Sequence, residues 1–234
     1  MSASQSHWLR WPTMLSVENL TIVQSGKRLW ESVSFTLAPG ERLGISAPSG
    51  FGKTTLGRVL AQWQSATAGH ILLEGKPLAK KGYCPVQLVP QHPEQSFNPY
   101  RTTGESLHDA WRPDADWLAR MAVNPDWLQR RPDELSGGEL ARIALLRALD
   151  PRTRYLIADE VTAQLDARIQ AQIWQVLLEE AEHRRLGLIV FSHNKALLEK
   201  VCSRIWIPER ESKTTIYPTP LVKPHLGLAM VKTG

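Results

Sequence analysis

The sequence predicts an α/β fold: a mainly parallel sheet covered by helices, with an antiparallel β part at the N-terminus and an inserted α-helical subdomain. Short apolar segments of strand length alternate with stretches of helical periodicity over most of the chain. A glycine-rich loop joins one such strand to a helix, and one stretch interrupted by prolines shows helical segments without strands. Buried strands that alternate with helices are typical of parallel sheets.

The first half of the chain supplies strands, a turn and a helix in order. The expected strands are Leu20–Val23, Val33–Leu37, Arg42–Ser46, Ile71–Leu73 and Gln87–Val89. Gly26 and Lys27 are expected in the turn between the first two strands. A helix follows the glycine-rich loop, because four apolar residues recur at the spacing of one helical face. These are Leu56, Val59, Leu60 and Trp63.

The second half begins with the expected helical insertion. From Glu105 to Arg131 helical segments are broken by Pro113 and Pro125. Its tryptophans, and most of the other tryptophans, are expected to serve packing. The remaining elements are a helix at about 138–149, a strand at 155–158, a helix at about 167–184 and a strand at 188–191. We therefore expect a single domain over 14–234: a core of 14–91 and 150–208, a helical subdomain of 92–149 and a tail of 209–234.

The composition of the chain limits the classes of function and partner that can be expected. A chain of 234 residues with 42% hydrophobic content can bury the core of one domain. The formal charge of +5 includes no block of like charge, so no nucleic-acid partner is expected. Cys84 and Cys202 form no C-x-x-C pair, which indicates a reducing, cytosolic compartment and two small core residues. Residues 1–13 lack the apolar region of a secretory signal, and the longest apolar run is too short to cross a bilayer.

A phosphate-binding loop is expected at Ala47–Thr54. Gly50 and Gly52 let backbone N–H groups approach phosphate oxygens, and the next helix adds its positive end. Lys53 is expected to reach the β- and γ-phosphates, and the Thr54 hydroxyl to bind Mg²⁺. The other expected nucleotide-binding residues of this loop are Ser49, Phe51 (through its backbone) and Thr55. Ala47 stands where the pattern has glycine, which is tolerable if its φ stays negative.

Further polar residues follow the ends of apolar strands, the edge at which open α/β sheets bind ligands. Asp159 is expected to assist Mg²⁺ binding, directly or through other ligands, and Glu160 to act as general base on the attacking water. His193 is placed to reach the γ-phosphate. Gln91 is expected to bind Mg²⁺ or water through its amide oxygen. Taken singly, the acids could cap the next helix, and His193 and Gln91 could be ordinary loop residues.

A second anion site is expected where Leu135–Glu139 opens a helix. Ser136, Gly137 and Gly138 offer a hydroxyl and unhindered backbone N–H groups there. A serine N-cap alone would explain Ser136 but not two glycines in the first helical turn. One nucleotide in one chain does not need two phosphate sites, so we expect a head-to-tail pair of subunits that share each nucleotide.

In this order, the segments resemble the ATPase subunit of ATP-binding cassette (ABC) transporters, from about Met14 to Pro208. The resemblance assigns Walker A to Ala47–Thr54, the Q-loop to Gln91, the signature to Leu135–Glu139, Walker B to Tyr155–Glu160, the D-loop to Ala163–Asp166 and the switch histidine to His193. It implies a P-loop NTPase (RecA-like) core that uses ATP and Mg²⁺. It also implies catalytic roles for Glu160, His193, Gln91 and Lys53, and nucleotide contact by Asp166.

Within the family, Gln91–Pro93 and Ser96–Thr102 resemble the ATPases of oligopeptide, dipeptide and nickel importers. This implies an ATP-hydrolysing subunit that energises import of peptides, nickel or a metal chelate, at the cytoplasmic face of the membrane. The implied partners are two membrane permeases, a second ATPase subunit, identical or different, and indirectly an extracytoplasmic solute-binding protein. The chain lacks the cysteine-bearing extension of the peptide branch, which favours the shorter member of an unequal pair and a nickel or metal-chelate solute.

The chain also departs from the family pattern. Val161 replaces the usual proline, and Gln164 interrupts the D-loop motif. No aromatic residue occupies the expected adenine-stacking region near Val23–Gln24, so Trp30 or a tryptophan near the N-terminus is the alternative platform. Two other function classes remain open. One is a soluble ABC ATPase that is not coupled to transport, and the other is a P-loop kinase, which would not need Leu135–Glu139.

Overall fold

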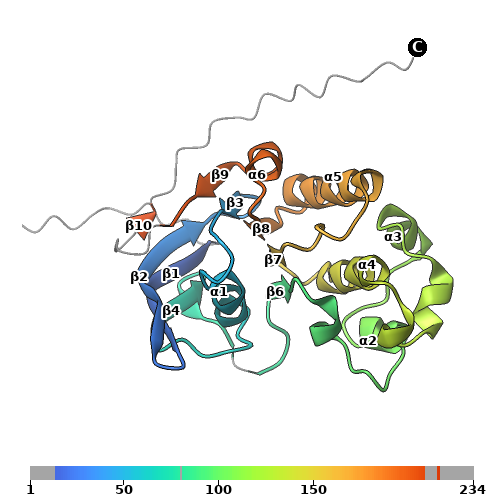
Figure 1. The fold of residues 1–234 in the computed structure, drawn as a ribbon, viewed down its shortest axis with the longest axis horizontal. Helices are drawn as coiled ribbons and strands as arrows, with labels where there is room; N and C mark the ends of the chain where they lie inside the picture. The colour runs from blue at the N-terminus through green and yellow to red at the C-terminus, as the bar shows by residue number, and fades with distance from the viewer. Residues whose placement is uncertain (1–13, 80, 209–214, 217–234) are drawn as a thin grey trace, which may run out of the picture.

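The computed structural model describes residues 14–79, 81–208 and 215–216, which form two five-stranded sheets and the helices packed around them (Figure 1). The strand orders are β10-β2-β1-β4-β5 and β6-β7-β8-β3-β9. In Figure 1 the first sheet lies at one end of the molecule, the second sheet in the middle, and α2, α3 and α4 at the other end.

The first sheet is the predicted antiparallel N-terminal part, to which β10, from the C-terminal tail, adds by pairing parallel with β2. Its strands are β1 (Leu15–Gln24), β2 (Lys27–Leu37), β4 (Ala68–Leu73), β5 (Lys76–Pro77) and β10 (Thr215–Ile216). Strand β1 pairs antiparallel with both β2 and β4. The β1–β2 turn is formed by Ser25 and Gly26, both with positive φ, as two-residue hairpins of matching twist require. Lys27, predicted in the turn, instead begins β2 and pairs with Gln24.

The second sheet is entirely parallel. Its strands are β3 (Arg42–Ile45), β6 (Val86–Val89), β7 (Tyr155–Asp159), β8 (Gly187–Phe191) and β9 (Arg204–Trp206). Every residue of β7 and β8 is buried, because both faces of the sheet are covered. Tyr155 and Ile157 pack into the core beside the first sheet and α1, whereas Leu156 and Ala158 pack into the core beside α4 and α5. The predicted α/β fold is confirmed.

The helices confirm the predicted insertion. Around the second sheet lie α1 (Lys53–Leu60), α4 (Gly137–Ala148), α5 (Ala167–His183) and α6 (Lys195–Val201). Between β6 and α4 lie short helices: α2 (Thr103–His108), α3 (Ala115–Arg120) and the 3₁₀ turns η1 (Pro93–Ser96), η2 (Pro125–Gln129) and η3 (Pro132–Glu134). Each 3₁₀ turn begins at a proline, whose missing N–H costs nothing at that position. Within the described residues, no helix has the length and hydrophobicity that a bilayer crossing requires.

The prediction that Trp63 extends the buried stripe of α1 is wrong. Leu56, Val59 and Leu60 are buried, but α1 ends at Leu60 and Trp63 is 45% exposed. Gln62 adopts φ +61°, its N–H donates to Val59 O, and the Trp63 N–H donates to Arg58 O at 2.8 Å. This is the Schellman pattern that ends helices, here formed without glycine.

Both cysteines carry free thiols that are partly buried, each against a hydrophobic cluster. Loss of solvation raises the pKa of the Cys84 thiol, and raises that of Cys202 to about 12. The two thiols therefore serve packing, as expected, although neither is fully enclosed.

The side chain of Tyr155 joins the two sheets. It is fully buried at the start of β7, where its hydroxyl accepts from Leu15 N and donates to Leu37 O, both at 3.1 Å. Burial raises its pKa to about 12, so the phenol remains protonated. The ring packs against Gly187, where an added Cβ would lie 2.4 Å from Tyr155 Cδ1.

We expect Tyr155→Phe to lower the free energy of unfolding by about 2 kcal/mol, because a buried N–H and a buried carbonyl both lose a partner. For a chain of this size the melting temperature should fall by about 5 °C. Thermal denaturation followed by circular dichroism measures the change, with the exposed Tyr100→Phe as control. Equal melting temperatures for the two variants would show that Tyr155 contributes only its ring.

Candidate active site

The glycine-rich loop between β3 and α1 has the backbone that its sequence predicts. Gly50 and Gly52 have φ of +74° and +99°, in the region that favours glycine, and Gly52 is the N-cap of α1. Ala47 has no positive φ, so the condition for alanine at this position is met. The loop thus aims the N-terminal backbone of α1 into the cleft described below, as an anion site requires.

Trp30 supports this loop from the protein interior. Its indole Nε1 donates to Gly52 O at 2.9 Å, and its ring packs edge-on against Phe51 with centroids 5.1 Å apart. Trp30 is only 4% exposed. It therefore cannot stack on a bound base, and that alternative is wrong. The other alternative, a tryptophan near the N-terminus, falls within residues 1–13, outside the described residues.

Lys53 brings a buried positive charge to the loop. Its Nζ donates to Ala47 O at 2.5 Å and to Pro48 O at 3.2 Å. These carbonyls belong to the loop itself, so the ammonium group lies within the curve of the backbone. A cation held there suits β- and γ-phosphate oxygens.

Thr54 and Asp159 meet although 105 positions separate them in sequence. Thr54 Oγ1 donates to Asp159 Oδ2 at 2.6 Å. Burial raises the pKa of Asp159 above its usual value, and the nearby Glu160 acts in the same direction. A buried carboxylate of this kind is stabilised by a cation close to it.

The oxygen donors here fit Mg²⁺ rather than a metal held by protein alone. Across the part of the chain that the structure describes, no three or more His, Cys, Asp or Glu side chains group to hold a metal. Mg²⁺ usually takes one or two protein ligands and completes its shell with phosphate oxygens and water. Thr54 and Asp159, with Gln91 in the same cleft, supply such ligands.

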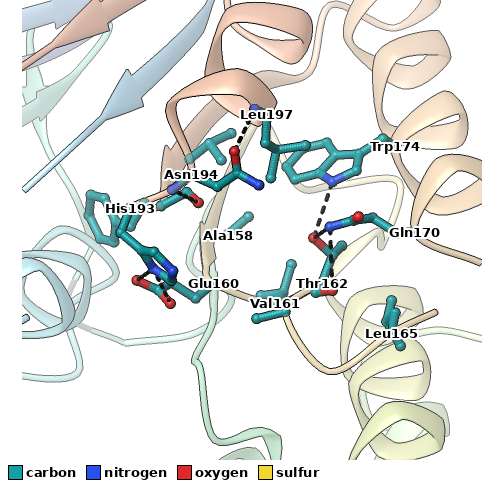
Figure 2. A pocket seen from close by; sticks show the side chains of 14 residues that line it. Ala158, Glu160, Val161, Thr162, Leu165, Gln170, Trp174, His193, Asn194 and Leu197 are labelled. Carbon is teal, nitrogen blue, oxygen red and sulfur yellow. Dashed lines mark hydrogen bonds and ion pairs between the residues drawn. The ribbon is translucent and has the colours of Figure 1, made fainter. Parts of the chain in front are cut away.

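Glu160 and His193 form a pair at the ends of β7 and β8. His193 Nδ1 lies 3.1 Å from both carboxylate oxygens of Glu160 (Figure 2). The Glu160 side chain is 10% exposed and that of His193 is 69% exposed. Glu160 also has φ +50°, a conformation that is uncommon outside glycine and often occurs at functional sites. The carboxylate is thus oriented by its backbone and by the imidazole.

One cleft of about 320 Å³ collects most of the predicted site. Its walls are Gln24, Leu29, Ser49, Gly50, Gly52, Lys53, Thr54, Thr55, Gln91, Asp159 and Glu160. Gln24 belongs to the region near Val23–Gln24 where the adenine was expected, and of the other lining residues only Leu29 was not predicted from the sequence. Gln24 Oε1 accepts from Thr55 Oγ1 at 3.2 Å, which ties the β1–β2 hairpin to α1. For Leu29, the only signal in the sequence is that its hairpin lies shortly before the loop.

Ser136, Gly137 and Gly138 do not line this cleft. Ser136 is the N-cap of α4, in a reciprocal capping box with Glu139. The Ser136 backbone N–H donates to the Glu139 carboxylate at 2.8 Å and lowers the pKa of that group. Gly137 lies against Gln164: an added Cβ would be 2.1 Å from Gln164 Oε1. Contact of these residues with a nucleotide stays a prediction.

Asp166 is likewise outside the cleft. It is the N-cap of α5, and its carboxylate accepts from the N–H groups of Arg168 and Ile169, both at 3.0 Å. This capping role accounts for an aspartate at the position. Its predicted contact with a nucleotide also stays a prediction.

A second cavity, of about 270 Å³, lies behind Glu160 and His193. Figure 2 shows this pair at one end of it and Thr162, Gln170 and Trp174 at the other. Thr162 Oγ1 accepts from Gln170 Nε2 at 2.9 Å and from Trp174 Nε1 at 3.2 Å. Helix α5 thereby holds the segment that follows Glu160.

Comparison with known proteins gives consistent matches. The family model described as "ABC transporter" matches residues 30–163. A probable peptide ABC transporter ATP-binding protein of Sinorhizobium fredii is 34% identical over 76% of this chain and 56% of its own length. A glutathione import ATP-binding protein of Pectobacterium atrosepticum is 34% identical over 75% of this chain and 31% of its own length. An oligopeptide transport ATP-binding protein of Bacillus subtilis is 30% identical over 82% of this chain and 66% of its own length. The chain thus spans between about a third and two thirds of the length of these relatives.

Solved structures match the fold. A dimeric ATP-binding cassette in a post-hydrolysis state, bound to ADP and Pi, has a TM-score of 0.70 at 21% identity, over 82% of this chain and 93% of that one. A dimeric bacterial ABC transporter cassette has a TM-score of 0.71 at 20% identity, with the same coverage.

Proposed function

The chain belongs to the ABC transporter family, and on this premise we propose that it binds and hydrolyses ATP as the nucleotide-binding subunit of an importer. The observation that carries the proposal is the meeting of Lys53, Thr54, Asp159 and Glu160 in one cleft. Two segments about a hundred residues apart supply a phosphate-binding cation, oxygen ligands and a carboxylate base. Few functions other than nucleotide hydrolysis need all of them together.

Each of the site residues would have a separate role in ATP hydrolysis. The loop N–H groups and Lys53 would bind and orient the triphosphate. Thr54, Asp159 and Gln91 would hold Mg²⁺, which neutralises charge on the phosphate oxygens. Glu160 would take a proton from the attacking water, and His193, hydrogen-bonded to Glu160, would keep that carboxylate in place and lie near the γ-phosphate.

A second subunit completes the proposed site. Ser136–Gly138 do not line the cleft of their own chain, which supports the proposal that they contact a nucleotide held by another subunit. The dimeric cassettes that share this fold support such an arrangement.

The names of the relatives support a transport role. Those reported above are named for peptide, oligopeptide or glutathione transport, which supports a peptide-like solute better than nickel or a metal chelate. We propose two membrane permeases as partners, a solute-binding protein acting through them, and a peripheral position on the cytoplasmic face. The core of 14–91 and 150–208 would bind the nucleotide, and residues 92–149 would form the helical and signature subdomain.

Two measurements test this proposal. Affinity purification of the tagged full chain from native membranes should recover two permease subunits, and the complex should release phosphate from ATP with Mg²⁺ and no acceptor. Recovery of soluble partners alone would favour an ABC ATPase that is not coupled to transport. Phosphate transferred to an acceptor, with none released, would favour a kinase.

A further inference from the structure

We propose that Thr162, Gln170 and Trp174 are positioning residues for Glu160. Hydrogen bonds from α5 to the Thr162 hydroxyl hold the turn that carries Glu160, and so fix the place of its carboxylate during hydrolysis. The proposal rests on the proposed function, because it takes Glu160 as the general base. It extends that site to three residues that do not line the nucleotide cleft.

Glu160 begins a tight turn and has an unfavourable backbone conformation. Its N–H donates to Phe191 O in β8, and its carbonyl accepts from Ala163 N, both at 3.0 Å. Its φ of +50° lies in the left-handed region, which a glutamate keeps only where surrounding contacts impose it. The orientation of the carboxylate therefore depends on the contacts that hold residues 161–163 in place.

Thr162 is the residue of this turn that α5 holds. It is 3% exposed and follows Glu160 by two positions. Its Oγ1 accepts from Gln170 Nε2 and from Trp174 Nε1, and these donors lie four residues apart, on the same face of α5. Figure 2 shows both side chains directed at the Thr162 hydroxyl. Trp174 packs in the hydrophobic core, so it is a fixed anchor for the turn.

Packing alone does not fix the turn. Residues 160–163 line the cavity of about 270 Å³ together with Trp174, so the turn and α5 are not in continuous contact. The two hydrogen bonds supply the missing constraint, because a hydrogen bond fixes direction whereas apolar contact does not. Their loss lets Glu160 relax toward negative φ, which moves its carboxylate away from His193 Nδ1.

The test replaces Thr162 by valine, which has a similar shape but no hydroxyl. Phosphate release at saturating ATP and equilibrium ATP binding are measured on the complex that contains the full chain. Turnover should fall about 10- to 100-fold, the effect of displacing a catalytic group by about 1 Å, while the dissociation constant for ATP changes less than about threefold. Thr162→Ser keeps the acceptor oxygen and should restore turnover to within about threefold of the wild type.

Two further variants separate positioning from a loss of stability. Thr153→Val is the matched control: Thr153 is also 3% exposed, its hydroxyl donates to Ala148 O at 2.6 Å, and it precedes β7 instead of following it. This variant should lower the melting temperature and leave turnover unchanged. Added to Glu160→Gln, Thr162→Val should reduce turnover by less than about twofold more, because the place of an absent base no longer matters.

The outcomes separate this proposal from the proposed function. Wild-type turnover in Thr162→Val, an equal loss in Thr153→Val, or a further loss of about tenfold on adding Thr162→Val to Glu160→Gln would each overturn the proposal alone. If Thr162→Val does not fold, Trp174→Phe decides: it removes one donor and should lower turnover about threefold, so wild-type turnover would overturn the proposal. No phosphate release by the folded wild-type complex would overturn the proposed function, and this proposal with it.

Discussion

Replacing Glu160 by glutamine should leave ATP binding intact and reduce hydrolysis by about 10²- to 10⁴-fold, the usual contribution of a general base. The amide has the size and hydrogen-bonding reach of the carboxylate, so the contact with His193 Nδ1 can persist. It cannot, however, accept a proton from water. The effect should therefore fall on turnover, with the dissociation constant for ATP changed less than about threefold.

Phosphate release and equilibrium binding on the same preparation measure the two effects separately. Glu182→Gln is a suitable control, because Glu182 is an exposed acid of α5 that lines neither cavity. Wild-type turnover in Glu160→Gln would remove Glu160 from the role of base. Weakened ATP binding by the same variant would instead place the carboxylate in the binding of Mg²⁺.

Lys53→Ala should weaken ATP binding by about 10- to 100-fold, since a charge-assisted hydrogen bond to phosphate contributes about 1.5–3 kcal/mol. The loss should be similar for ATP, GTP and tripolyphosphate, because Lys53 interacts with the phosphates alone. Calorimetric titration of each ligand measures it. Lys200→Ala, at an exposed position of α6, controls for the loss of one positive charge.

Two results would contradict the role of Lys53. Unchanged affinity for all three ligands would mean that the loop N–H groups bind the phosphates without it. A melting temperature far below that of Lys200→Ala would show that the hydrogen bonds from Lys53 to Ala47 O and Pro48 O stabilise the loop itself.

The sequence predicted those parts of the site that depend on local pattern. Asp159 and Glu160 could be placed at the carboxyl edge of the sheet because the first four residues of β7 are apolar, Asp159 ends the strand and Glu160 follows it. Gly50 and Gly52 could be predicted because glycine marks the positive φ that this loop needs. In both cases the residues that carry the chemistry lie within the short sequence pattern that predicts the local backbone structure.

Other features depended on contacts that no short pattern encodes. Trp30 could not be oriented, because its strand carries side chains on two faces and only tertiary packing shows which face is buried. The end of α1 was missed because Gln62 takes the left-handed conformation that usually marks glycine. Gln24 and Leu29 join the site only when the β1–β2 hairpin folds over α1.

The partial burial of the Cys84 and Cys202 thiols has a practical consequence. The thiolate is the form that attacks maleimides and similar reagents, and at neutral pH a thiol whose pKa is raised is almost entirely protonated. Cys84 and Cys202 should therefore remain unlabelled while a cysteine introduced at a solvent-facing position, for example Tyr100→Cys, reacts. Fluorophores or cross-linkers can then report on subunit association without prior removal of the native sulfur atoms.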